Sequence, residues 1–394
     1  MALTIIVFIL ILGLLVLVHE AGHFLVAKRN GVPSEEFGFG FPPRLVGIYK
    51  DKKGKRRFIF GNKTISEEEK DKDETVYSIN LIPLGGFVKI RGESEEESQG
   101  DPKSFVNQSA WKRFKILFAG VGMNFVLAMV LFAFAFQLGL PESITDEMEA
   151  RDPKVQIARV MDGTPADELG IEMGDEVISL TTAQGKSYDD IKKVGRLQEL
   201  IKENAGQKVD LKLKRPGEGI VSVSTQIREQ APENEGLLGV QLVRTDFVKH
   251  GFFESVWMGI KTTFSLIVTI IVFLVDLIVK IFISEPVGSD VAGPVGIAVL
   301  TGKMTKLGIA HILQFTALLS VNLGIINLLP IPALDGGRIL FLAIEKIKGS
   351  PVSQKVEGLV HTVGFFFLIG LMILVTARDF INFEILDKVK GLFS

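Results

Sequence analysis

Long apolar runs alternate with polar stretches along the chain, and the first of these runs covers residues 1–28. It begins without a basic residue and ends at the pair Lys28 and Arg29. A secretory signal would instead have a basic start and a shorter apolar core. About 20 apolar residues are enough to cross a bilayer as a helix, and cytoplasmic flanks are rich in Lys and Arg. The run predicts a first transmembrane helix whose C-terminal end lies on the cytoplasmic side.

Later apolar runs predict further membrane segments. We expect a second transmembrane helix at residues 111–140, a third at 308–346 and a fourth at 357–378. A further segment at residues 252–284 contains an apolar run, 256–283, that is interrupted by Lys261, Asp276 and Lys280. We interpret it as an amphipathic or re-entrant segment that does not cross the membrane.

Two polar regions separate these runs. Residues 29–110 contain short strand-like stretches around the turn Gly85-Gly86, so we expect a cytoplasmic or membrane-associated β-loop region. Residues 150–246 have the length and composition of an independent domain. Within it we expect strands at 155–160, 176–180, 209–214 and 221–226 and a helix at 188–204. Residues 163–180 resemble the helix and turn of a bacterial PDZ domain, a fold that can add a peptide strand to a sheet edge.

Composition limits the chemistry that the chain can perform. Of its 394 residues 47% are hydrophobic, and the mean hydropathy is +0.33, which is too apolar for an ordinary soluble protein. With 44 Lys and Arg against 46 Asp and Glu, the formal net charge is −2, so no basic surplus indicates nucleic-acid binding. Cysteine is absent, which excludes a disulfide framework, a thiolate metal site and a cysteine nucleophile.

The first apolar run contains the sequence HEAGH, which begins at His19 and ends at His23. On a helix, residues four apart lie on one face, so both imidazoles can reach one metal ion. Glu20 is then placed to take a proton from metal-bound water. Two histidines packed without a metal are the alternative, but such polar groups are costly inside an apolar span unless they have a function.

A catalytic zinc ion needs a third protein ligand and one open position. Several side chains in apolar surroundings are candidates: Asp276, His311, Asp335, Glu345 and His361. Asp335 stands out because it follows Pro-Ile-Pro at the end of an apolar run and precedes two glycines. A carboxylate on a broken helix at membrane depth indicates a cavity or site. A role as the N-cap of the following helix is compatible with metal binding. For Asn124 in the second run, contact between helices and a position beside the active site are both open.

HEAGH, the PDZ-like insert, GPVGI at 293–297 and NLLPIPALDGG at 327–337 together resemble the bacterial site-2 proteases. These are intramembrane zinc metalloproteases of the regulator-of-sigma-E protease type. The resemblance implies that His19, His23 and Asp335 bind one zinc ion, with Glu20 as the catalytic base. It also implies that Asn327 holds an unwound substrate, and that residues 82–93 form the membrane-associated β-loop of the family. The family often carries two PDZ domains, whereas only one fits this chain.

A helical substrate hides its carbonyl groups in its own hydrogen bonds, so it must unwind before cleavage. We expect exposed backbone edges to capture the unwound strand. The candidates surround the glycine turn and the Pro-broken stretch: Gly85, Gly86, Phe87, Val88, Asn327, Pro330 and Pro332.

The number of crossings is consistent with this scheme. The first helix ends at the cytoplasmic side and the second returns the chain to the outside. Asp335 can meet the histidines only if residues 309–329 run from outside to inside, so the segment 252–284 between them must not cross. We therefore expect a polytopic α-helical membrane protein with about four transmembrane helices, one inserted extracytoplasmic PDZ-like α+β domain and a membrane-associated β-loop.

The resulting prediction is a zinc endopeptidase of the bacterial plasma membrane. Its substrates would be transmembrane segments of single-span proteins, such as anti-sigma-factor-like proteins or remnant signal peptides. Its partners would be these substrates, the lipid bilayer and peptides or ectodomains bound by the PDZ-like domain, and no nucleic acid. A non-catalytic PDZ membrane scaffold and a zinc transporter are the alternatives, and Glu20→Gln separates the three.

Overall fold

The computed structural model describes residues 2–63, 65–66, 68–93, 101–161, 163–232, 236–283, 293–350 and 352–382. The chain divides into two compact units, each described by itself. The helical unit comprises Met1–Ala133, Val256–Thr305 and Ile312–Ser394. The β unit comprises Phe134–Ser255 and Lys306–His311.

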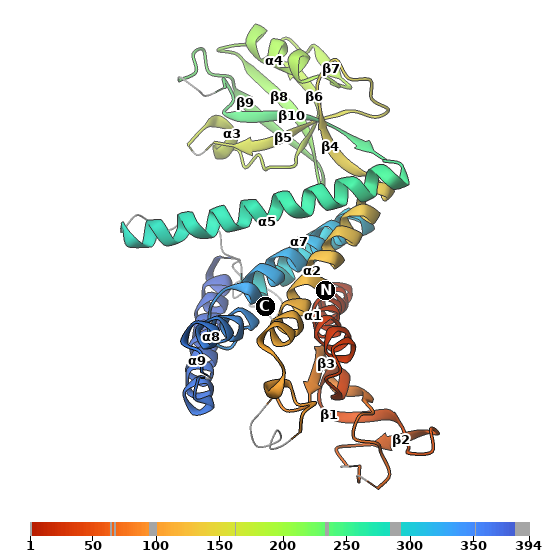
Figure 1. The fold of residues 1–394 in the computed structure, drawn as a ribbon. Coiled ribbons are helices and arrows are strands. Elements are labelled where there is room, and N and C mark those ends of the chain that lie inside the picture. Colours follow the sequence, from red (N-terminus) through yellow and green to blue (C-terminus); the bar gives the residue numbers. More distant parts are fainter. Residues whose placement is uncertain are drawn as a thin grey trace, which may run out of the picture. The chain divides into compact units, whose positions relative to one another are not determined.

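Five helices in the described part of the chain are long and apolar enough to cross a membrane (Figure 1). They are α1 (Ala2–Arg29), α2 (Ala110–Leu138), α5 (Phe252–Phe282), α7 (Ile309–Leu328) and α9 (Gln354–Asn382). The predicted third helix at 308–346 is divided, because α7 ends at Leu328 and α8 (Asp335–Lys348) begins only at Asp335. Pro330 and Pro332 lie in the break, and proline removes a backbone N–H and clashes with the preceding helical turn.

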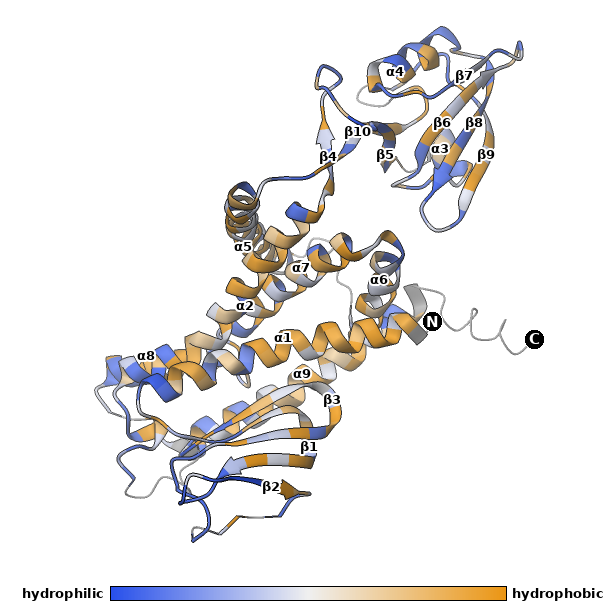
Figure 2. Ribbon diagram, turned by 90° about the vertical axis from the view of Figure 1, so that its right-hand side faces the viewer, coloured by the Kyte–Doolittle hydropathy of each residue, from blue (hydrophilic) through white to orange (hydrophobic). Residues whose placement is uncertain are grey.

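The segment predicted to be amphipathic or re-entrant, residues 252–284, contains one continuous helix of 31 residues, α5. Its charges do not break the helix, since Lys280 and Asp276 are one turn apart and pair at 2.7 Å. The chain therefore does not dip and return within α5. Both views show α5 running across α2 instead of alongside the other long helices (Figures 1 and 2).

Small residues bring the helices around α1 and α2 into close contact. A Cβ atom added at Gly22 would lie 2.3 Å from the carbonyl oxygen of Ala119, and one at Gly324 of α7 would lie 2.8 Å from the Phe125 ring. Such residues allow helix backbones to approach closely in lipid. The packing leaves no room for a side chain at either glycine.

A three-stranded antiparallel sheet packs against α1. Its strands are β1 (Ser34–Lys50), β2 (Arg56–Phe60) and β3 (Val76–Ile90), in the order β2-β1-β3. Gly38 of β1 pairs with both Ser78 and Phe87, so β3 flanks this part of β1 on both sides. Residues 86–90 therefore form an outer edge of the sheet. β3 lies beside α1 (Figure 2). Gly85 and Gly86 allow this close approach, because added Cβ atoms would lie 2.9 Å from Val16 and 3.2 Å from Leu17.

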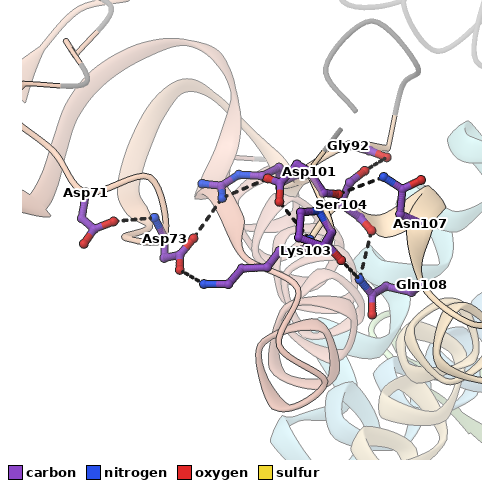
Figure 3. A network of polar contacts seen from close by, with 10 residues as sticks. Asp71, Asp73, Gly92, Asp101, Lys103, Ser104, Asn107 and Gln108 are labelled. Atoms are coloured by element: carbon purple, nitrogen blue, oxygen red, sulfur yellow. Dashed lines mark hydrogen bonds and ion pairs between the residues drawn. The ribbon is translucent and has the colours of Figure 1, made fainter. Parts of the chain in front are cut away.

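A network of polar contacts fixes the chain just beyond β3 (Figure 3). Arg91 contacts Asp73 at 3.0 Å and Asp101 at 3.6 Å, and Lys103 also pairs with Asp73. The hydrogen bond from Lys103 holds the pKa of the Asp73 carboxyl below its usual range, so the network is charged at neutral pH. The network places the short 3-10 helix η2 (Phe105–Asn107) beside the end of β3.

The β unit is a seven-stranded sheet with two helices. The strand order is β4-β10-β5-β6-β8-β9, and β7 pairs with β6. Its elements are β4 (Leu140–Ile144), β5 (Lys154–Val160), α3 (Pro165–Glu168), β6 (Glu176–Thr182), β7 (Ser187–Asp189), α4 (Val194–Glu203), β8 (Lys208–Arg215), β9 (Gly219–Gln226) and β10 (Val240–Val248). Strands occur at all four predicted places, whereas the predicted helix at 188–204 begins later, at Val194.

The segment that precedes β5 belongs to the β unit. β4 pairs with β10, and the Asp146 carboxylate accepts the N–H groups of Val194 and Gly195 at 3.0 Å and 2.7 Å, at the start of α4. Arg244 is buried and donates to the carbonyl groups of Thr145 and Met148. The domain limits predicted at 150–246 thus omit residues that complete the sheet and cap its main helix.

We predict that a fragment of residues 140–248 folds by itself and is more stable than one of 150–246. Asp146→Ala in the longer fragment should lower its free energy of unfolding by about 1 kcal/mol, the usual loss for a helix cap. Urea unfolding of the three proteins measures both effects. Equal stability of the two fragments would contradict the assignment of residues 140–149 to this unit.

Candidate metal centre

Two imidazoles and one carboxylate meet inside the helical unit. His19 and His23 lie one turn apart on α1, and their Nε2 atoms are 3.1 Å from one another. Oδ2 of Asp335 lies 3.1 Å from Nε2 of His19 and 3.3 Å from Nε2 of His23. Among the described residues, these three form the group of side chains arranged to hold a metal ion.

The spacing of these three atoms suits a tetrahedral metal ion. Ligands about 2.0–2.1 Å from a tetrahedral zinc ion lie about 3.3–3.4 Å apart, close to the observed separations. Oδ2 of Asp335 is buried and has no hydrogen-bond donor among the described residues. A buried carboxylate oxygen without a donor is costly unless a cation compensates it. The two nitrogens and one oxygen therefore fit zinc.

Asp335 reaches the histidines because the chain turns tightly after α7. A Cβ atom added at Gly336 would lie 2.2 Å from the Leu328 carbonyl oxygen, and one added at Gly337 would lie 2.4 Å from the Ile331 carbonyl oxygen. Both glycines are needed to fold the start of α8 back onto the end of α7. Asp335 is the first residue of α8, whose N-cap is Leu334. The alternative role of Asp335 as an N-cap is therefore wrong.

α2 orients both imidazoles. Nδ1 of His23 lies 2.8 Å from the Ile116 carbonyl oxygen, to which it donates, and Nδ1 of His19 lies 3.2 Å from the Asn124 amide. Asn124 is fully buried, and its Oδ1 has no partner. Turning its amide by half a rotation would let Nδ1–H of His19 donate to Oδ1. Both Nε2 atoms are then free to bind a metal, as in sites where a second partner fixes the tautomer.

The sequence left Asn124 open between a helix contact and a position beside the active site, and the structure places it on His19, next to Gly120, which the sequence did not single out. An added Cβ atom at Gly120 would lie 2.3 Å from Nε2 of His23, in the space that the metal needs. An asparagine and a small residue inside an apolar run were the available signals, and both are common at ordinary helix contacts.

A cavity of about 300 Å³ opens beside the three candidate ligands. Glu20 lines it and accepts the Val88 N–H at 3.1 Å. Gly86, Phe87 and Val88 of the sheet edge line the same cavity, as do Leu334 and Arg338. The helix that carries HEAGH and the predicted strand edge therefore border one space.

The other predicted site residues are not among the described residues that line this cavity. Nδ2 of Asn327 lies 3.5 Å from Nε2 of His19, next to the candidate metal position. Gly85 packs on Val16, Pro330 is exposed, and Pro332 packs against Gly364 of α9. The remaining candidates for a third ligand contact other groups. These are Asp276 with Lys280, His311 with Phe247, Glu345 with Arg113 and His361 with Ala333.

Several apolar helices around a buried two-histidine, one-carboxylate site define a class, the membrane-embedded metalloproteases with HExxH. Residues 7–59 and 52–371 match peptidase family M50. The chain belongs to this family, the site-2 proteases, and is a multi-pass membrane zinc metalloprotease.

Relatives match over nearly the whole chain. A protein of Clostridium acetobutylicum whose name describes a zinc metalloprotease is 33% identical over 375 residues, covering 95% of this chain and 96% of the relative. A similarly named protein of Clostridium perfringens is 33% identical, covering 93% and 95%. Regulator of sigma-W protease RasP of Bacillus subtilis is 29% identical, covering 95% and 98%.

We predict that Asn124→Leu weakens zinc binding roughly 10- to 100-fold, the range for residues that orient metal ligands. Asn124→Asp should bind zinc nearly as well as the wild type, because its carboxylate can accept the Nδ1–H of His19. Competition with a zinc chelator measures both affinities. Equal weakening by the two substitutions would show that Asn124 serves packing and not the imidazole.

Proposed function

We propose that the chain is an intramembrane zinc endopeptidase that cuts transmembrane segments of single-span membrane proteins in regulated intramembrane proteolysis. One zinc ion would be held by His19, His23 and Asp335. The observation that carries the proposal is the convergence of these three side chains, at 3.1–3.3 Å, beside a cavity bordered by the outer edge of the sheet. The name of the RasP relative supports substrates of the anti-sigma-factor type. Remnant signal peptides are the other substrate class of this proposal.

The chemistry requires an activated water and a base. Zinc bound at this site would polarise the scissile carbonyl group and lower the pKa of a water molecule. Glu20 follows His19 directly and lines the cavity, so its carboxylate is the group that takes the proton and passes it to the leaving amine. Its contact with the Val88 N–H holds it beside the sheet edge.

The edge of β3 is the proposed binding site for an unwound substrate. Because the Val88 N–H points to Glu20, it points away from β1, and every second residue of a strand shares its direction. Gly86 and Ile90 therefore present their backbone groups to the same space. An extended substrate can add to this edge by main-chain hydrogen bonds. Asn327, whose Nδ2 lies 3.5 Å from Nε2 of His19, is proposed to hold the other side of the substrate.

One face of the sheet supports the proposed membrane association. The register sets Ile48 between Phe58 and Tyr77, and Val46 between Phe60 and Ile79, on one face. Phe58 and Phe60 are 67% and 66% exposed, which is unusual for large side chains facing water. This face continues to α1, because Phe37 of the sheet stacks on Phe24 of α1. The face therefore suits contact with lipid.

Contacts within the helical unit support four spans. Gly259 of α5 packs on the second half of α2, at Met129 and Ala133. After α5, the helix α6 (Pro294–Leu307) packs at Gly302 on Thr4, near the end of α1 opposite His19. The start of α5 and the α6 helix that follows α5 thus both contact parts of α2 and α1 that are remote from the candidate metal site. We propose that α5 lies along the outer surface, and that α1, α2, α7 and α9 cross.

The β unit is proposed to be an extracytoplasmic PDZ-like domain that contacts peptides or ectodomains, in a protein of the bacterial plasma membrane. Its order of strands and helices, with α4 beside β10, supports this proposal. A non-catalytic scaffold would use the same domain. A zinc transporter would need polar groups along a path, whereas the candidate ligands lie at one depth.

We predict that Glu20→Gln abolishes cleavage of a transmembrane substrate by at least about 100-fold, while bound zinc remains. Asp335→Ala should lose most bound zinc together with cleavage, because two imidazoles alone hold the ion weakly. Purified variants would be compared by metal analysis and by cleavage of a reconstituted single-span substrate. Full activity of Glu20→Gln would exclude the peptidase mechanism, and full zinc in Asp335→Ala would exclude the ligand set.

A further inference from the structure

The stretch between α7 and α8 contains a backbone conformation that is rare for its residue. Ala333 has φ of +74°, in the left-handed region that L-residues other than glycine seldom adopt. It lies two residues before Asp335 and lines the metal-site cavity. Reversal of the chain at this point turns Asp335 toward His19 and His23. Because this conformation is unfavourable for alanine, contacts with other residues must stabilise it.

Local hydrogen bonds hold the backbone of the residues on either side of Ala333. The Ile331 N–H donates to the Leu329 carbonyl oxygen at 2.7 Å, and the Leu334 N–H donates to the Ile331 carbonyl oxygen at 3.2 Å. The Ala333 N–H instead donates to Nδ1 of His361 at 2.7 Å. His361 belongs to α9, so the turn is held by a different helix.

α9 is pressed closely against this turn. A Cβ atom added at Gly364, one helical turn after His361, would lie 2.4 Å from Cβ of Pro332 and 2.8 Å from its carbonyl oxygen. The His361 ring also packs beside Phe341 of α8, with ring centroids 5.6 Å apart. The imidazole is thereby fixed between the turn and α8.

The tautomer of His361 follows from these contacts. Since Nδ1 accepts the Ala333 hydrogen, it carries no proton, and the proton of the neutral ring lies on Nε2. Nε2 is buried without a hydrogen-bond partner among the described residues, and Oε1 of Glu357 lies 3.9 Å away. The acceptor bond to Ala333 is therefore the one hydrogen bond of the ring within the part of the chain that the structure describes.

We propose that His361 is a positioning residue, whose Nδ1 holds Ala333 in its left-handed conformation and so sets the Asp335 carboxylate for zinc. The proposal rests on the proposed function, because it concerns the same metal site. It gives the last transmembrane helix a role in the active site without contact with metal or substrate.

Three substitutions separate the acceptor bond from packing. His361→Phe keeps a ring and removes the acceptor, whereas His361→Asn keeps an acceptor oxygen at the position of Nδ1. Ala333→Gly removes the conformational strain, because glycine adopts positive φ readily. Thr362→Val is the matched control, as its hydroxyl donates to the Gly358 carbonyl oxygen in the preceding turn of α9.

Zinc affinity of the full-length protein, measured by chelator competition, is the first readout. We expect His361→Phe to weaken zinc binding roughly 10- to 100-fold. His361→Asn and Thr362→Val should stay within about threefold of wild type, since neither loses the bond. Adding Ala333→Gly to His361→Phe should restore much of the loss. Hydrogen exchange of the metal-free proteins is the second readout. The Ala333 amide should lose protection in His361→Phe and keep it in His361→Asn and Thr362→Val.

The outcomes are distinguishable from those for the proposed function. Wild type that binds no zinc would overturn the metal site itself. Wild type that binds zinc, together with unchanged affinity in His361→Phe, would overturn the role of His361 only. Equal loss in His361→Phe and His361→Asn, or no recovery with Ala333→Gly, would mean that the ring acts by packing and would also overturn it.

Discussion

The approach of the Asp335 carboxylate to the imidazoles of His19 and His23 is the interaction on which the helical unit depends. A carboxylate buried among apolar helices is unfavourable unless opposite charge and hydrogen bonds compensate it. Here its Oδ2 atom is buried and unpaired except for the two imidazoles. A cation at this position would compensate this unfavourable group and link α1 to α8.

Much of the surrounding structure brings these groups together. Gly22 and Gly120 lack the side chains that would hold α1 and α2 apart, and Gly336 and Gly337 let the start of α8 fold back onto the end of α7. Polar groups of α2 contact Nδ1 of both imidazoles, which leaves both Nε2 atoms facing Asp335. The sheet edge reaches the same cavity from another direction through Val88 and Glu20. The proposed base, the candidate ligands and the strand edge thus border one cavity.

The sequence predicted the features that depend on neighbouring residues. Apolar runs located α1, α2, α7 and α9, and the spacing of His19 and His23 placed both on one helical face. Features set by distant contacts were harder to predict. α4 begins at Val194 because Asp146, far away in sequence, caps it, so the local pattern of residues 188–193 was misleading. Likewise, His361 was a candidate ligand by composition, but its contact with Ala333 depends on how α9 packs.

The central claim, that two imidazoles and one carboxylate of this chain hold a single zinc ion, is tested most directly by zinc-edge X-ray absorption on the purified full-length protein. The account predicts one zinc per chain, with two imidazole nitrogens and at least one oxygen at about 2.0–2.1 Å. Loss of one oxygen shell contribution in Asp335→Ala would identify the carboxylate. A site with more than two imidazoles, or with a second zinc ion in each chain, would contradict the account.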